Sequence, residues 1–212
     1  MKVSNFNIIL NVGNSNFFSC LEHDLVRNPT LSLPTIDDIV PLIPQSSTTL
    51  ESRGLTLFID PLDGTKEFIN NSETVPMTMV GICYEDNPIV GILYQPFLQS
   101  LIVGIVNSGC YRLMYGRLIP LEEINSNTGL ILTTTQSHYT DELNEKLLKI
   151  QPEKIIKEGG AGYKSVNLIE NNAQVYCYPA KGTSLWDTCA PEACILSMGG
   201  KITDCNVCIA LY

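Results

Sequence analysis

LTLFIDPLDGT, residues 55–65, joins an apolar run to a short turn that carries two carboxylates. The apolar run predicts a buried strand, and the proline and glycine that follow predict a turn at its carboxyl end. Such a turn can direct the side chains of Asp60 and Asp63 and the Leu62 carbonyl to one point. Oxygen ligands of this kind suit Mg2+, which keeps several waters and takes phosphate oxygens from a substrate. The Thr65 hydroxyl follows immediately, where it can position a water. The alternative is an Asx-turn that only closes a strand.

A second motif, LWDTCAPEACILSMGG at residues 185–200, predicts a helix. Asp187 is expected to be the N-cap, Pro191 is expected in the first turn, and the paired glycines predict the C-terminal stop. An Asp at a helix start by itself indicates a capped helix. The two interpretations are compatible, because a carboxylate held rigidly beside the bulky Trp186 can also bind a metal ion.

The composition fits an enzyme with a packed core. The chain has 212 residues, of which 44% are hydrophobic, and a formal net charge of −9. This length is long for one domain and allows two small ones. The negative charge argues against binding to DNA or RNA as a polymer, which needs clustered Lys and Arg. An anionic small substrate stays possible, because bound metal ions invert the local field. The chain shows no apolar run of membrane-spanning length and no signal peptide pattern.

Eight cysteines are scattered through the chain, mostly in apolar contexts. This pattern predicts buried, reduced thiols in a cytoplasmic protein rather than a disulfide framework. Cys205 and Cys208 form a C-x-x-C pair that allows a redox or zinc role, but no second Cys or His pair completes a zinc site.

The rest of the chain follows two patterns. After the first strand, apolar runs separated by turn sequences predict an antiparallel meander with strands at 77–83, 89–94, 100–106 and 109–114. From residue 130 on, strands expected at 130–134, 154–157 and 174–178 alternate with helices, as in an α/β layer.

The helices of this second half are expected in three places: after Ser137 or Thr140, at 163–170, and after Asp187. The first should place Leu143, Leu147, Leu148 and Ile150 on one side. We therefore predict a mixed α/β (α+β) protein whose halves, 1–128 and 129–212, meet at a boundary near residue 128.

The two motifs together carry a family resemblance. DPLDGTKEF at 60–68 and the Trp186-Asp187 pair resemble the lithium-sensitive, magnesium-dependent phosphatases of the inositol monophosphatase superfamily. TTTQSH at 133–138, GGAGYK at 159–164 and WDTCAPE at 186–192 are similar to its 3'(2'),5'-bisphosphate nucleotidase branch. The resemblance covers residues 54–204 and implies a layered αβαβα fold with a sheet in each half.

The resemblance also implies roles for residues of this chain. Two or more Mg2+ ions would be held by Asp60, Leu62, Asp63 and Asp187, with Asp60 and Thr65 acting in catalysis. The positions expected to contact the substrate are Gly64, Thr65, Thr135, His138, Gly160 and Lys164. Lys66 and Glu67 are interpreted as a structural ion pair or a solvated loop.

The ends of the chain depart from the family pattern. Family members begin with two long helices, one with an Asp that helps to activate water, and then present a Gly-Glu-Glu turn with a metal ligand. Residues 1–53 show neither clearly, and the nearest match to the turn makes Glu22 a weak candidate ligand. After residue 204 the family continues into further strand and helix, so we expect a copy truncated at both ends.

Three functions follow as hypotheses. The first is a Mg2+-dependent, lithium-sensitive phosphatase that converts adenosine 3',5'-bisphosphate to AMP and phosphate, with a role in sulfate assimilation. The second is an inositol phosphate phosphatase, which would share the metal residues but not depend on His138 or Lys164. The third is a catalytically incomplete fragment. The expected partner is a small nucleotide bisphosphate, and the expected state is a monomer or a homodimer.

Overall fold

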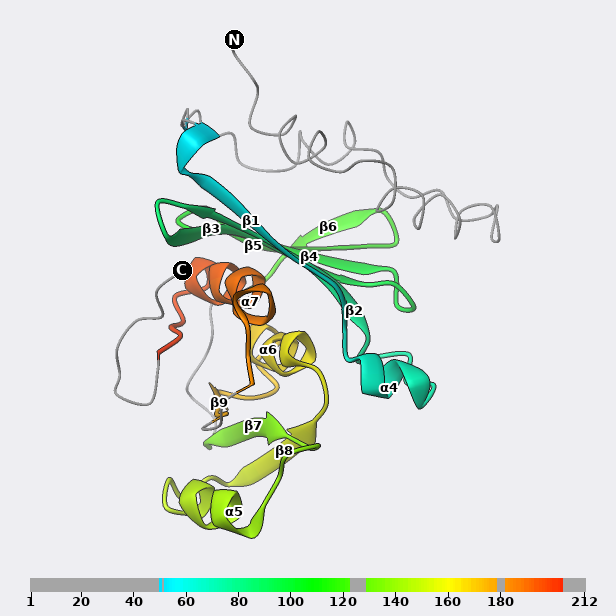
Figure 1. Cartoon of the computed structure of the whole chain (residues 1–212), viewed down its shortest axis with the longest axis vertical. Coiled ribbons are helices and arrows are strands. Elements are labelled where there is room, and N and C mark those ends of the chain that lie inside the picture. Colours follow the sequence, from blue (N-terminus) through cyan, green and yellow to red (C-terminus); the bar gives the residue numbers. More distant parts are fainter. Residues whose placement is uncertain (1–49, 51, 123–128, 179–181, 204–212) are drawn as a thin grey trace. The chain divides into compact units, whose positions relative to one another are not determined.

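A computed structural model of the chain describes residues 50, 52–122, 129–178 and 182–203 (Figure 1). The chain divides into two compact units, Met1–Arg53 and Gly54–Tyr212. The described elements belong to the second unit, apart from a single 3-10 turn, η2 (Ser52–Gly54), at its start.

The first sheet has six strands in the order β1-β2-β3-β4-β5-β6, all antiparallel neighbours. Its strands are β1 (Leu55–Asp63), β2 (Met77–Tyr84), β3 (Asn87–Gln95), β4 (Ser100–Ile105), β5 (Gly109–Met114) and β6 (Arg117–Pro120). The predicted meander is confirmed. The last strand was not predicted, because its four residues include an arginine and a proline and show no apolar alternation.

The first strand runs further than predicted. It continues past residue 59 to Asp63, and its pairing with β2 shifts between Asp60 and Asp63. Such an irregularity bends a strand and redirects its side chains. A short helix, α4 (Thr65–Ile69), follows directly after Gly64, which has a φ of 73°.

The second sheet is parallel and has the order β8-β7-β9. It consists of β7 (Ile131–Thr135), β8 (Lys154–Glu158) and the short β9 (Val175–Tyr176), connected through α5 (Asp141–Leu148) and α6 (Ala161–Ile169). The predicted alternation of strand and helix is confirmed. The boundary near residue 128 stays a prediction, since residues 123–128 lie outside the described part.

Helix α5 differs from its prediction in one respect. Thr140 caps it, with its side chain accepting a hydrogen bond from the Leu143 N–H. Leu143 and Leu147 are buried as expected, but Leu148 and Ile150 are exposed. The helix ends at residue 148, so its buried stripe is shorter than the sequence pattern predicted.

Helix α7 (Leu185–Ser197) lies directly on the six-stranded sheet (Figure 1). The helix packs on a row of glycines that we call the glycine seat of α7. Its members, Gly81, Gly91 and Gly104, are paired partners on three neighbouring strands. A Cβ at Gly91 would collide with the Ala190 carbonyl of the helix. The helix backbone therefore rests against the sheet backbone, which fixes the position of the helix closely.

The start of α7 corrects a sequence prediction. The N-cap is Ser184 rather than Asp187, and Asp187 is the third residue of the helix in a capping box with Ser184. Because the helix begins at Leu185, Pro191 lies in its second turn and not in its first. The Ser-x-x-Asp spacing is a capping-box pattern, which accounts for the earlier start.

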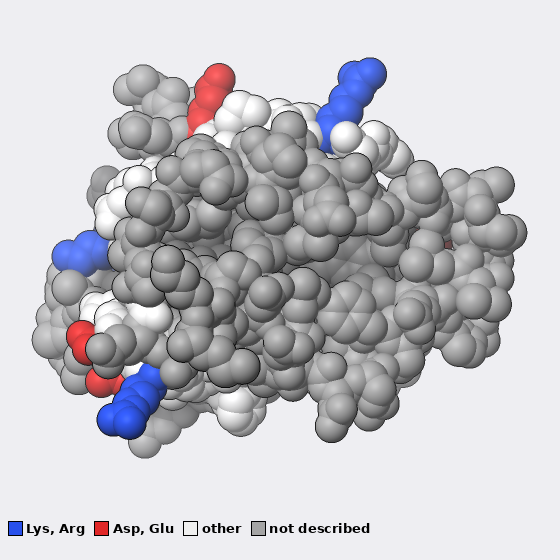
Figure 2. All heavy atoms as spheres, turned by 90° about the horizontal axis from the view of Figure 1, so that it is seen from above, with Lys and Arg blue, Asp and Glu red and all other residues white. Residues whose placement is uncertain are grey.

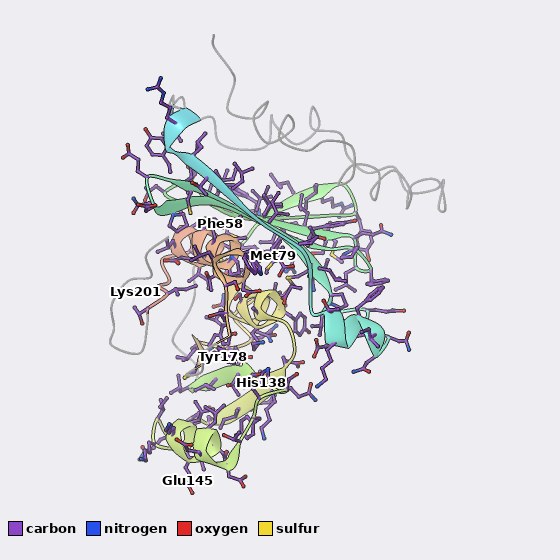
Figure 3. The ribbon with its side chains drawn as sticks, in the orientation of Figure 1. Phe58, Met79, His138, Glu145, Tyr178 and Lys201 are labelled. Atoms are coloured by element: carbon purple, nitrogen blue, oxygen red, sulfur yellow. The ribbon has the colours of Figure 1, made fainter. Side chains whose placement is uncertain are left out.

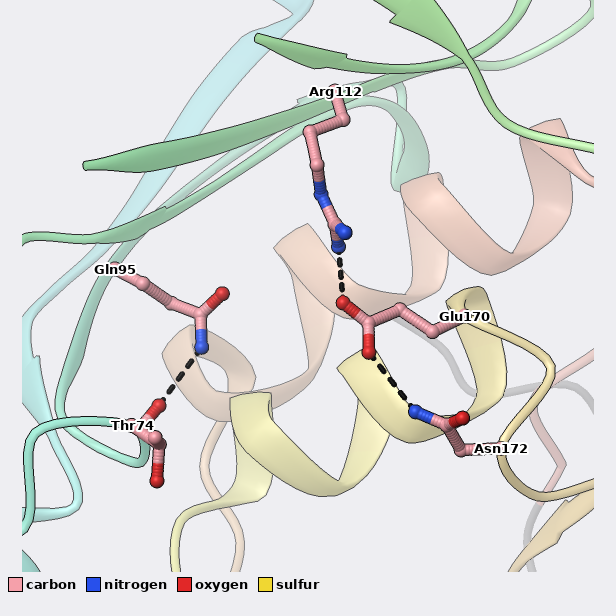
Figure 4. A network of polar contacts seen from close by, with 5 residues as sticks. All are labelled: Thr74, Gln95, Arg112, Glu170 and Asn172. Atoms are coloured by element: carbon pink, nitrogen blue, oxygen red, sulfur yellow. Dashed lines mark hydrogen bonds and ion pairs between the residues drawn. The ribbon is translucent and has the colours of Figure 1, made fainter. Parts of the chain in front are cut away.

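The main core lies between the six-stranded sheet and the helices α6 and α7. Met79 of β2 belongs to this core, and Phe58 lies on the adjacent strand (Figure 3). Arg112 of β5 pairs with Glu170 at the end of α6, which ties the sheet to the helix layer (Figure 4). Gln95 of β3 donates to the carbonyl of Thr74, in the loop before β2, at 2.8 Å (Figure 4).

The described layers are thus antiparallel sheet, helices, parallel sheet and helix α5, as expected for a mixed α/β protein. Residues 1–49, in which the sequence shows no clear match to the family's N-terminal helix pair, lie outside the described part. None of the helices in the described part has the length and apolar character that a bilayer crossing requires.

Candidate metal centre and substrate cavity

Three carboxylates from distant parts of the sequence meet in one cluster. Asp60 and Asp63 lie at the end of β1, and Asp187 lies in the first turn of α7. One carboxylate oxygen of each residue lies within 4.8 Å of the others. Asp60 and Asp63 are largely buried, with 8% and 9% of their surfaces exposed. The cluster therefore offers hard oxygen ligands that are largely shielded from solvent. Oxygen is the ligand type that Mg2+ or Ca2+ requires.

Backbone N–H groups hold each carboxylate in place. Asp60 accepts a hydrogen bond from the Leu62 N–H at 3.0 Å, and Asp187 accepts one from the Ser184 N–H at 2.6 Å. Each carboxylate has further lone pairs, so these bonds orient the side chains and leave oxygens for a cation.

Asp63 has a second task at the start of α6. Its two oxygens accept hydrogen bonds from the N–H groups of Ala161 at 3.1 Å and Gly162 at 2.7 Å. Both N–H groups of this glycine-rich turn are therefore bonded to Asp63 rather than open to a substrate. A negative charge at a helix start is favourable. Through these two bonds, Asp63 also connects the end of β1 to the second half of the molecule.

Burial and the neighbouring negative charges raise the pKa of Asp60 from 3.8 to about 6. Burial is the main cause, and the charges of Asp63 and Asp187 add to it, while the Leu62 N–H acts in the opposite direction. The pKa of Asp63 is also raised, again mainly by burial, against the hydrogen bonds from Gly162 and Ala161. A divalent cation would relieve both effects, so the residues present fit a metal ion.

The Leu62 carbonyl and the Thr65 hydroxyl lie next to this cluster and bond to each other. Thr65 Oγ1 donates to the Leu62 carbonyl at 3.0 Å. The carbonyl keeps a lone pair that can bind a cation, and the hydroxyl oxygen keeps lone pairs that can accept a hydrogen bond from a water.

A cavity of about 250 Å3 opens beside the carboxylates. All six predicted substrate residues line it: Gly64, Thr65, Thr135, His138, Gly160 and Lys164. These residues come from three segments that are up to 100 positions apart, and the fold brings them together. Tyr176, Tyr178 and Ser137 also line the cavity and were missed, because single residues on short segments carry no recognisable spacing.

The segment between β7 and α5 forms one wall of the cavity. The His138 N–H donates to Thr135 Oγ1 at 3.3 Å, which fixes the turn after the strand. Thr135 is buried, and the His138 side chain is exposed at the end of the parallel sheet, as is seen in Figure 3 together with Tyr178.

Lys66 and Glu67 do not form the predicted ion pair with each other among the described residues. Lys66 Nζ lies 3.4 Å from Ser137 Oγ, across the cavity rim. The Glu67 carboxylate lies against Gly159, where a Cβ would collide with it. Both side chains therefore connect α4 to the second half of the molecule.

Glu22, the weak candidate ligand, lies outside the described residues, as does the pair Cys205 and Cys208. Among the described residues, Cys83, Cys110, Cys189 and Cys194 are buried and form no disulfide. In Figure 2, the described residues show a few separate acidic and basic side chains.

A carboxylate cluster that fits a metal ion, set between two sheets beside a polar cavity, is typical of a metal-dependent phosphatase. Residues 27–211 match the sequence profile of the inositol monophosphatase family, so the chain belongs to that family. The predicted resemblance is confirmed.

The curated relatives include two proteins named 3'(2'),5'-bisphosphate nucleotidase 1. The one from Dictyostelium discoideum is 38% identical over 84% of this chain and 61% of its own length. The one from Homo sapiens is 31% identical over 80% of this chain and 56% of its own length. The chain thus spans roughly three fifths of the length of these relatives, and the predicted similarity to the nucleotidase branch is confirmed.

A solved structure supports the fold. CysQ from Bacteroides thetaiotaomicron, a bacterial member of the inositol monophosphatase family, superimposes with a TM-score of 0.60 at 24% identity. The superposition covers 69% of this chain and 60% of that structure. This likeness confirms the predicted class of fold.

Proposed function

We propose that the protein is a Mg2+-dependent phosphatase that removes the 3'-phosphate of adenosine 3',5'-bisphosphate, giving AMP and phosphate. The observation that carries the proposal is the meeting of Asp60, Asp63 and Asp187 beside a cavity lined by all six predicted substrate residues. The names of the two nucleotidase relatives support the choice of substrate.

Asp60, Asp63, Asp187 and the Leu62 carbonyl would hold two or more Mg2+ ions. Bound there, the ions would supply charge neutralisation for the phosphate oxygens and lower the pKa of an attacking water. Glu22 belongs to this proposal as a further ligand from outside the described residues.

Thr65 orients the nucleophile in this scheme. Its hydroxyl proton is used in the bond to the Leu62 carbonyl, so its oxygen is left to accept a hydrogen bond from the water. A water that donates one proton to Thr65 turns a lone pair toward the phosphorus, which is the orientation that in-line displacement needs.

The opposite wall of the cavity would bind the nucleotide. Lys164 supplies a buried positive charge, and His138 and Thr135 supply hydrogen-bonding groups at the end of β7. Gly64 and Gly160 have φ values of 73° and 62° and carry no side chain, so a substrate can approach their backbones closely.

The second candidate is an inositol phosphate phosphatase, which the family name favours. It would use the same carboxylates, but an inositol mono- or polyphosphate has no nucleotide base, and the reaction would not depend on His138 or Lys164. A catalytically incomplete chain is the third candidate, since the relatives are longer than this chain.

The test is phosphate release from adenosine 3',5'-bisphosphate and from inositol 1-phosphate, with Mg2+ and with or without lithium. The proposal expects faster release from the nucleotide, inhibition by lithium, and a loss of the nucleotide preference in Lys164→Met. Faster release from inositol 1-phosphate would favour the second candidate. A folded chain that releases phosphate from neither would favour the third.

We extend the proposal to a cytoplasmic setting, with the role in sulfate assimilation that the resemblance implies. The cysteines support this setting, because they are scattered and lie mostly in apolar contexts, as reduced thiols of a reducing compartment do.

A further inference from the structure

Lys164 is an unusual lysine, because it is buried on α6 with only 4% of its surface exposed. Its ammonium donates to the Gly160 carbonyl one turn earlier in the chain. The same ammonium lies 5.4 Å from the centre of the Tyr176 ring, within the range of a cation–π contact. Both side chains line the cavity beside the carboxylates.

The ammonium has few other partners to offset its burial. Among the described residues, the ion pairs join Arg112 to Glu170 and Lys146 to Glu142, so Lys164 has no carboxylate at ion-pair distance there. Burial lowers the pKa of Lys164, and the more distant charges of Asp63, Glu67, Glu158 and Asp187 act in the opposite direction. The aromatic face is therefore one of two close contacts that favour the charged form.

The Tyr176 ring is well placed to be a fixed support. Tyr176 ends the short strand β9 and is paired with Thr133 of β7. The next residue is also held, because Thr134 Oγ1 donates to the Cys177 carbonyl at 2.8 Å. The backbone beneath the ring is thus attached to the parallel sheet, and the ring does not depend on Lys164 for its position.

We infer that Tyr176 is a positioning residue whose aromatic face holds the Lys164 ammonium in the cavity, ready for an anionic group of the substrate. The inference rests on the proposed function for the identity of that anion, which is the phosphate of a nucleotide that is not hydrolysed. The ring face performs the task, and the phenolic hydroxyl is not needed for it. Phenylalanine should therefore replace Tyr176, whereas leucine should not.

The first test needs no ligand. The rate at which an acetylating reagent modifies Lys164 is measured by mass spectrometry in the wild type, Tyr176→Phe and Tyr176→Leu. Loss of the ring releases the amine, so Tyr176→Leu should raise the rate about tenfold, while Tyr176→Phe should stay within about twofold. Equal rates in all three proteins would overturn the inference.

The chain offers a matched control for this test. Lys157 Nζ lies 3.5 Å from the centre of the Tyr139 ring, in a similar pair that does not line the cavity. Tyr139→Leu is the matched change, because it also replaces the tyrosine of a lysine–tyrosine pair in the same half of the molecule. Lys164 should keep its wild-type rate in this variant. A rise in Lys164 modification equal to that in Tyr176→Leu would mean general loosening and would overturn the inference.

The second test measures the binding of AMP and of adenosine, which differ only in the 5'-phosphate. Tyr176→Leu should weaken AMP binding about tenfold and leave adenosine binding unchanged, and Tyr176→Phe should bind both as the wild type does. An equal loss for both ligands, or equal losses in the two variants, would overturn the inference. Failure of the proposed function would appear separately, as wild-type protein that binds AMP no better than adenosine, while the acetylation test still decides on Tyr176.

Discussion

Asp60 combines a poor environment for its own charge with a good environment for a cation. Its pKa of about 6 results mainly from burial and from the neighbouring carboxylates. The ionised Asp60 carboxylate destabilises the metal-free fold, yet the fold holds it in a fixed position. This combination is typical of functional residues.

The first prediction concerns the stability of the metal-free protein. The folded pKa of Asp60, about 6, lies above the value of 3.8 for an unperturbed Asp, so the folded state binds the proton more tightly. The stabilisation from this proton is complete below pH 4 and is lost as the pH rises through 6. Asp60→Asn should therefore be more stable than the wild type at pH 7.5 by about 2 kcal/mol, and equally stable near pH 4.

Urea unfolding with a chelator at both pH values measures this difference. Asp86→Asn is the control, because Asp86 is exposed in a turn with a φ of 63°, which Asn also adopts. A variant Asp60→Asn that is less stable than the wild type at pH 7.5 would show that the carboxylate is held by favourable contacts that outweigh the crowding.

The sequence predicted the three aspartates because their local patterns are specific, but it did not predict what holds them. The bonds from Ala161 and Gly162 to Asp63 join residues about a hundred positions apart, which no local pattern reveals. The capping box of Asp187 was readable from its spacing to Ser184, and the interpretation of Asp187 as N-cap missed it.

At the scale of elements, α7 is fixed by the glycines beneath it. Gly81, Gly91 and Gly104 each lie against the backbone or small side chains of the helix. This close approach sets the height of α7 above the sheet, and so sets how near Asp187 comes to Asp60 and Asp63. The sequence shows each glycine inside an apolar run, but their alignment across strands depends on the register and was not predicted.

The second prediction tests this seat. Gly91→Ala should destabilise the fold by about 2 kcal/mol, because its Cβ collides with the Ala190 carbonyl and the helix must move. The same variant should bind Mg2+ more weakly, because the movement carries Asp187 away. Gly116→Asn is the control, since Gly116 has a φ of 71° and open space around its Cβ position. A Gly91→Ala protein with wild-type stability and Mg2+ affinity would contradict the proposed role of the seat.

At the scale of the whole molecule, the candidate metal centre of Asp60, Asp63 and Asp187 lies where the two halves of the described unit are joined. Asp63 of the antiparallel sheet bonds to the start of α6, which follows the parallel sheet, and Arg112 pairs with Glu170 at the other end of the same helix. A cation bound by Asp60, Asp63 and Asp187 would add a third connection between β1, α6 and α7.

The third prediction follows from this arrangement. Mg2+ at about a hundred times its dissociation constant should stabilise the wild type by about 2.7 kcal/mol, because it binds the folded state alone. Asp60→Asn should lose most of this gain, so its advantage in stability without metal should shrink or disappear. Thermal unfolding with Mg2+, compared with NaCl at equal ionic strength, measures the effect. An equal gain in both proteins would place the metal elsewhere.

The sequence predicted the class of fold, but its local patterns did not predict how the sheets and helices are stacked. Alternating apolar runs gave the meander, and alternating strands and helices gave the α/β half, because both are local patterns. The strand order β8-β7-β9 and the packing of α7 on the other sheet depend on contacts between distant segments. Only the family resemblance implied a layered arrangement.

The most direct test of the central claim is the release of phosphate from adenosine 3',5'-bisphosphate by this 212-residue chain as Mg2+ is added. The account predicts release that rises with Mg2+ and falls by more than about a hundredfold in Asp187→Asn, while Glu145→Gln, an exposed change on α5, stays at the wild-type rate. A folded chain whose release does not depend on Mg2+, or an Asp187→Asn variant as active as the wild type, would contradict it.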